Sequence, residues 1–281
     1  MANLHIRKLI IDLYIQFHQW NDALLECENL VDYHPEREEV YHLLGRIYRN
    51  CGETEIVQRI LENAISQNIF LPCVINSLVQ IYVSQGQSEN GVRLFKTLVE
   101  QFPDSLHYKT ELSVLYAKNQ QYTEASDIIF SLAESYPERS ADYGNELALL
   151  LKNCPDNNVI RHRLIQLYIR SCHPIEALPL IQDMINVDSG AIDQAIADLR
   201  LSLELYPDID EVKIALASTL PHQQEYTEAV TLLSDVFDHN KSLNDQIKKI
   251  LNQISALCPQ QFVARILSCD IALFENDFDE A

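Results

Sequence analysis

The densest group of side chains that could bind a ligand is Arg161-His162-Arg163, with His173 ten residues further along the chain. Histidine is a common metal ligand. The arginines on both sides of His162, however, are permanently charged and would repel a cation. We therefore predict neither a metal site nor a cofactor in this chain.

Motifs of catalysis and of nucleotide binding are missing from the sequence. The chain has only six glycines, and it contains no G-x-G-x-x-G or G-x-x-x-x-G-K-[ST] segment. It also lacks H-E-x-x-H, G-x-S-x-G and any cysteine and histidine cluster with zinc spacing. The seven cysteines are scattered singly, as is typical of reduced thiols in the cytosol. We therefore predict a cytoplasmic protein that is not an enzyme.

The charge of the chain is strongly negative. There are 41 acidic residues against 21 basic ones, and the formal net charge is −20. Nucleic acids and anionic membrane surfaces require a basic protein surface, so neither is an expected partner. No stretch approaches the roughly 18 uninterrupted apolar residues of a membrane span, and residues 1–17 lack the apolar core of a signal peptide.

A repeat organises the first half of the sequence. Four tyrosines recur at intervals of 34 residues: Tyr14, Tyr48, Tyr82 and Tyr116. Three prolines follow the first, third and fourth of them by 21 residues: Pro35, Pro103 and Pro137. Apolar residues between these markers recur at helical spacing, and a proline cannot continue a helix. Each window is therefore expected to hold two antiparallel helices, with Gly52 and Gly86 at positive φ where first helices end.

Two short motifs identify the type of repeat. Leu44-Gly45-Arg46-Ile47-Tyr48 gives a Leu-Gly-x-x-Tyr step. An aromatic residue three positions before an alanine occurs at Trp20/Ala23, Tyr122/Ala125, Tyr226/Ala229 and Phe278/Ala281. With the 34-residue period, these motifs resemble the tetratricopeptide repeat family. The resemblance implies an all-α fold, a right-handed α-solenoid of helical hairpins.

In the second half the period grows to 52 residues. Two series show it: Ala125, Ala177, Ala229 and Ala281, then Pro155, Pro207 and Pro259. The added segments, Ser140–Cys154, Ile192–Tyr206 and Asn244–Cys258, are each long enough for one helix and place a leucine at matching positions: Leu147, Leu199 and Leu251. This departs from the family pattern and predicts three-helix units.

We therefore predict three two-helix units over residues 1–105, three three-helix units over residues 106–261, and the start of a further unit over residues 262–281, which we interpret as truncated. The sum is sixteen helices. Two prolines interrupt the pattern. Pro179 is expected to kink its helix or to begin it late, and Pro221 is expected to end its helix a turn early.

The resemblance also places a groove. In tetratricopeptide arrays the first helix of each pair lines the concave surface, which implies that the face opposite the Leu-Tyr stripe points at the ligand. The predicted peptide-binding residues on that face are Lys8, His42, Arg46, Arg49, Asn50, Asn76, Gln80 and Lys118. Arginine binds carboxylates through two parallel hydrogen bonds, and amides bond to an extended peptide backbone. We expect a protein or peptide partner with an acidic or polar segment.

The best-known site of the family is a carboxylate clamp for the acidic C-terminal tails of heat-shock chaperones. It requires Lys and Asn on one helix, Asn on the next, and Lys with Arg on the third. The corresponding positions in this chain hold Lys8, Asp12, Leu43, Cys73 and Ser77. Only Lys8 agrees, and Asp12 would repel a carboxylate, so the sequence disfavours binding of a chaperone tail.

The function predicted from the sequence is a non-catalytic module or scaffold that binds a polypeptide segment in its groove. Two alternatives belong to other classes. In the first alternative, the chain is an N-terminal docking or regulatory arm of an enzyme whose catalytic domain follows residue 281. In the second, it is a scaffold that self-associates through its C-terminal end.

Overall fold

The computed structural model describes residues 4–51 and 54–275. Over these ranges it contains sixteen α-helices, four short 3-10 helices and no strand. The expected all-α architecture of stacked helices is therefore confirmed. None of the described helices combines the length and the apolar character that a bilayer crossing requires. The chain divides into two compact units, Met1–Gln120 and Gln121–Ala281, which are considered separately below.

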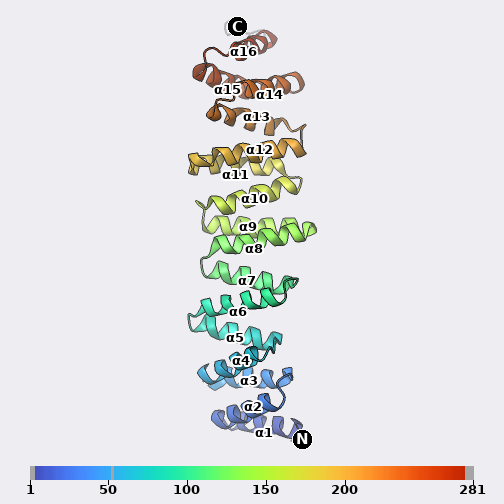
Figure 1. Ribbon diagram of the computed structural model, residues 1–281, viewed down its shortest axis with the longest axis vertical. Helices are drawn as coiled ribbons and strands as arrows, with labels where there is room; N and C mark the ends of the chain where they lie inside the picture. The colour runs from blue at the N-terminus through green and yellow to red at the C-terminus, as the bar shows by residue number, and fades with distance from the viewer. Residues whose placement is uncertain (1–3, 52–53, 276–281) are drawn as a thin grey trace. The chain divides into compact units, whose positions relative to one another are not determined.

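The N-terminal unit is a stack of seven helices in which each helix packs against the next one along the chain. Figure 1 shows this order from blue to green. First helices also pack against first helices, as α3 does against α5. The bounds are α1 Leu4–Gln16, α2 Trp20–Tyr33, α3 Glu38–Cys51, α4 Thr54–Ser66, α5 Pro72–Ser84, α6 Ser88–Gln101 and α7 Leu106–Lys118.

The C-terminal unit contains nine α-helices among its described residues, again stacked in chain order. The α-helices are α8 Tyr122–Ser135, α9 Ser140–Asn153, α10 Asn158–Arg170, α11 Pro174–Val187, α12 Ile192–Leu205, α13 Asp210–Thr219, α14 Tyr226–His239, α15 Asn244–Leu257 and α16 Phe262–Glu275. The 3-10 helices are η1 Pro137–Arg139, η2 Ser189–Ala191, η3 Leu220–Gln223 and η4 Lys241–Leu243.

First helices end in a left-handed turn that follows the spacing of the repeat. Asn68 has a positive φ after the second helix α4, while the positive-φ residues that follow first helices are His18, Gly86, Gln120, Cys172 and Gln224. Each is followed by a second helix, and the positions differ by multiples of 34 or by 52. Gly86 has the expected positive φ, whereas Gly52 lies outside the described residues. Four of the five turns use a residue other than glycine, so the positions of the glycines predict only part of this feature.

The marker tyrosines take part in these turns through their backbone. The Gln87 N–H donates to the Tyr82 carbonyl at 2.7 Å, and the Gln19 N–H donates to the Tyr14 carbonyl at 2.9 Å. This bond spans the left-handed residue and satisfies a carbonyl that the helix itself leaves unpaired. The tyrosine spacing therefore marks where each of these helices must end.

Prolines end the second helices as predicted. Pro35, Pro103 and Pro137 each lie two residues after the last residue of α2, α6 and α8. Pro221 lies in η3, and α13 before it has only ten residues, so the early end of that helix is also confirmed.

Pro179 lies inside α11. The expectation that it delays the start of the helix is wrong, because α11 already begins at Pro174. Pro174 can begin the helix, because the N–H that proline lacks has no intrahelical partner in the first turn and the fixed φ of proline suits a helix.

The three added segments are helices that contribute to the core. Their matching leucines, Leu147, Leu199 and Leu251, are each 0% exposed. The third helix packs against the first helix of the same group in the pairs α10/α12 and α13/α15. The second helix packs against the next first helix in the pairs α8/α10, α11/α13 and α14/α16. A recurring set of contacts therefore accompanies the 52-residue period.

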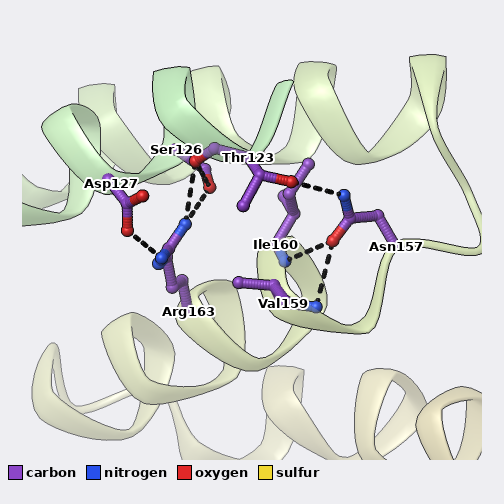
Figure 2. A network of polar contacts seen from close by, with 7 residues as sticks. All are labelled: Thr123, Ser126, Asp127, Asn157, Val159, Ile160 and Arg163. Atoms are coloured by element: carbon purple, nitrogen blue, oxygen red, sulfur yellow. Dashed lines mark hydrogen bonds and ion pairs between the residues drawn. The ribbon is translucent and has the colours of Figure 1, made fainter. Parts of the chain in front are cut away.

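A polar network joins α8 to α10 within the C-terminal unit (Figure 2). The side-chain oxygen Oδ1 of Asn157 accepts from the backbone N–H groups of Val159 and Ile160 at 3.0 and 3.1 Å, which caps α10. Its amide nitrogen donates to Thr123 Oγ1 at 3.0 Å. Arg163 donates to the Thr123 carbonyl at 3.0 Å and also contacts Ser126 and Asp127. These bonds fix α10 against the first turn of α8.

The buried position of the added helix makes a testable prediction about stability. Leu147→Ala removes a fully buried side chain of α9 and is expected to destabilise the protein by about 3 kcal/mol through the cavity it leaves. Leu149→Ala, on the same helix but at a residue that is 60% exposed, should change stability by less than about 0.5 kcal/mol. Thermal unfolding followed by circular dichroism measures both, and equal midpoints would contradict the packing of α9.

Candidate peptide-binding site

The predicted binding face lies on the first helices of the N-terminal unit. Two rows of positions, 34 residues apart, run across α1, α3, α5 and α7. The first row is Lys8, His42, Asn76 and Thr110, and the second row is Asp12, Arg46, Gln80 and Val114. Every side chain in both rows is exposed or half-buried. We call this surface the first-helix face.

Where α1 meets α3, the basic side chains of this face already form ion pairs. Arg46 Nη1 lies 2.8 Å from Asp12 Oδ1, and Lys8 forms an ion pair with Glu39. The sequence predicts that cations on this face bind an acidic or polar ligand, but these two cations already have acidic partners within the protein. Asp12 and Arg46 are one repeat apart, so the period itself contained the signal that pairs them.

The amides on α5 are in a different situation. Asn76 and Gln80 are exposed and one turn apart, and within the part of the chain that the structure describes neither has a hydrogen-bond partner. Two exposed valines add apolar surface. Val83 lies on the same helix and is 42% exposed, and Val114, one repeat after Gln80, is 41% exposed. Lys118 is exposed at the end of α7. Such a surface can hydrogen-bond a backbone and cover small apolar side chains.

Two predicted residues cannot be placed on this face. Arg49 and Asn50 lie in α3, but their side chains are outside the described part of the structure.

A cluster that the sequence did not reveal lies at the start of α3 and α5. His42 Nε2 is 3.4 Å from Glu38 Oε1, and the ligand atoms of these two residues and of Cys73 all lie within 4.8 Å of one another. Burial raises the pKa of the Cys73 thiol, and the nearby Glu38 carboxylate raises it further. Cys73 is 31 residues after His42 in sequence, well outside the short ligand spacings typical of zinc fingers.

The basic segment that the sequence singled out is structural. Arg161 is buried and donates to the Pro155 carbonyl and to Asn158. His162 Nδ1 lies 2.9 Å from Asp198 Oδ2 on α12, and Arg163 belongs to the network of Figure 2. His162 and Arg163 join α10 to other helices, whereas Arg161 bonds within α10 and to the loop before it, so each of the three has its own structural partners.

Cavities lie away from the first-helix face. An open hollow of about 390 Å³ in the N-terminal unit is lined by α4, α5 and α6, and in it Tyr82 Oη donates to Glu62 Oε1 at 2.8 Å. A larger one of about 820 Å³ in the C-terminal unit lies among α8, α9, α10 and α11 and includes Gly144, Arg170 and His173. A glycine within the added helix was the only sequence signal for this space.

Comparison with known proteins identifies the repeat. A model of the tetratricopeptide repeat matches residues 78–105, which include the second half of α5 and all of α6. No curated protein sequence matches the chain.

The solved structures that match this chain share little sequence with it. A chain of the Naa15/Naa10 complex bound to HypK-THB is 15% identical, with a TM-score of 0.42, over 94% of this chain and 43% of that one. This chain therefore spans less than half the length of that protein. A tetratricopeptide repeat protein from Parabacteroides merdae ATCC 43184 is 15% identical, with a TM-score of 0.40, over 88% of this chain and 98% of that one.

A third structure, the TPR2AB domain of yeast Sti1 in complex with pHSP90, is 13% identical, with a TM-score of 0.34, over 92% of this chain and 97% of that one. The assignment rests on the repeat model and on the helix pairs that share its period. This assigns residues 78–105 to the tetratricopeptide repeat, and the helix pairs of the N-terminal unit share its 34-residue spacing.

Proposed function

We propose that this chain is a non-catalytic protein-interaction scaffold that binds an extended polypeptide segment across the first-helix face. Repeat proteins of this type offer extended surfaces built from several units. The observation that carries the proposal is the pair of exposed amides, Asn76 and Gln80, which have no partner among the described residues. An extended peptide has unpaired N–H and C=O groups, and each side-chain amide both donates and accepts.

The ion pairs refine the chemistry expected of the ligand. A carboxylate that approaches Arg46 or Lys8 has to displace Asp12 or Glu39. The α1 and α3 part of the face therefore favours a neutral polar segment over an acidic one. Lys118, which has no ion pair among the described residues, remains available to an acidic group at the α7 end.

Three further statements stay predictions. They are the cytoplasmic location, the absence of catalysis by this chain, and the alternative that it is a docking or regulatory arm of an enzyme whose catalytic domain follows residue 281.

The amides provide the direct test of the proposal. Peptides selected on the full chain from a random phage-displayed library serve as probes, and their affinity is measured by fluorescence anisotropy. Asn76→Ala combined with Gln80→Ala is expected to weaken binding by about tenfold through the loss of two or more hydrogen bonds. The unfolding temperature should not change, because both side chains are exposed.

A matched control removes amides elsewhere on the same unit. Gln67→Ala combined with Gln101→Ala alters exposed amides at the ends of α4 and α6 and should leave the affinity unchanged. Equal affinities for the wild-type chain and the Asn76/Gln80 variant would refute binding on the first-helix face.

The ion pair between α1 and α3 gives a second test. Asp12→Asn removes the acidic partner of Arg46 and should strengthen binding of an acidic probe peptide by up to about fivefold, since an exposed pair is worth at most about 1 kcal/mol. The gain should disappear at high salt. Asp32→Asn, an exposed residue of α2 with the same change of charge, is the control. A gain of the same size in both variants would attribute the effect to net charge alone.

Self-association is a second proposal, supported by the exposed apolar side chains of α16. Val263, Ile266 and Phe274 are each more than half exposed. Light scattering over a range of concentrations should then give masses above the 32.3 kDa of one chain, and Ile266→Glu should restore that value. A mass of one chain at every concentration would exclude this proposal.

A further inference from the structure

The cluster at the start of α3 and α5 combines three kinds of metal-binding atom. Glu38 and His42 are one helical turn apart on α3, and Cys73 is the second residue of α5. The two helices pack against each other, which brings the thiol to the carboxylate and the imidazole. All three ligand atoms lie within 4.8 Å of one another.

The distances suit a tetrahedral zinc ion. Zinc binds imidazole nitrogen and carboxylate oxygen at about 2.0 to 2.2 Å, so two such ligands on one ion are about 3.4 Å apart. His42 Nε2 and Glu38 Oε1 are 3.4 Å apart in the protein. These two side chains would need little movement to share an ion, while the Cys73 thiol would come closer by a change of rotamer.

The surroundings leave the three groups available. Glu38 Oε1 lies 3.4 Å from His42 Nε2, whereas the adjacent Glu39 forms an ion pair with Lys8. Cys73 forms no disulfide, and the backbone N–H groups of Cys73 and Val74 lie near its thiol, where they favour the thiolate. Glu38 and His42 are exposed and Cys73 is half-buried, so an ion can arrive from solvent and keep water at its fourth position. A thiolate and a carboxylate together balance the charge of Zn²⁺.

We propose that Glu38, His42 and Cys73 form a zinc site that joins α3 to α5. Binding deprotonates the Cys73 thiol, whose proton passes to the solvent, and the thiolate sulfur becomes a ligand. Because the ligands come from the first helices of two consecutive windows, the bound ion links the two repeats. It stabilises the folded N-terminal unit by mass action, because an unfolded chain does not hold the three ligands together.

Cobalt provides a spectroscopic probe of this site. The reduced full chain, titrated with Co²⁺ alone, should develop a thiolate-to-cobalt charge-transfer absorption, and Zn²⁺ added afterwards should abolish it. Cys73→Ser should lose this absorption. His42→Ala should weaken Zn²⁺ binding by at least about tenfold, since loss of even an outer-shell partner of a metal ligand costs 10- to 100-fold. Because His42 is exposed, this variant tests the site without disturbing the core.

Matched controls use the same residue types on other helices. Cys172→Ser removes an exposed thiol, and His107→Ala removes an exposed histidine of α7, and both should behave like the wild-type chain. Zn²⁺ should raise the unfolding temperature of the wild-type chain and of both controls but not that of Cys73→Ser. The proposal is overturned if no charge-transfer absorption appears, or if Cys73→Ser binds Co²⁺ as the wild-type chain does, which would indicate adventitious binding only.

Discussion

The tight turn between a first helix and its second helix is the constraint on which the rest of the structure depends. In these turns a residue at positive φ lets the chain reverse within a few residues, and the Gln87 N–H closes the turn on the Tyr82 carbonyl. The two helices are then antiparallel neighbours with a fixed register. Small residues on the second helix allow close contact, since Ala23, Ala125 and Ala177 are 0% exposed. One such pair cannot bury its own apolar surface, so neighbouring helices must stack on it.

Features that depend on local sequence could be predicted, whereas features that depend on register could not. The helices, the proline-terminated ends and the added helix with Leu147 follow from periodicity and from the chemistry of proline. The ion pair of Arg46 with Asp12 requires knowing that equivalent first helices lie side by side. The approach of Cys73 to His42 requires the relative position of α3 and α5. Left-handed residues other than glycine have no local signal that a glycine search detects.

The few basic residues act mainly between helices. Several pairs join neighbours in the stack: Arg59 with Glu28, Arg170 with Glu134, Arg200 with Glu228, and Lys213 with Asp235. Each exposed pair contributes little to stability, at most about 1 kcal/mol. Together these pairs engage several of the 21 basic residues, which the 41 acidic residues already outnumber about two to one. Recognition by hydrogen bonds and shape therefore suits this surface better than recognition by charge.

The left-handed turns also bear on how this chain could be made more robust. Four of them hold His18, Gln120, Cys172 and Gln224, and a side chain in that conformation costs roughly 1 to 2 kcal/mol. Glycine would remove this cost but would add about 0.4 to 1 kcal/mol of entropy to the unfolded chain. The difference leaves a net reserve of stability at these four turns. Glycine substitutions at these turns could therefore raise the stability of the scaffold without changing any side chain of the first-helix face.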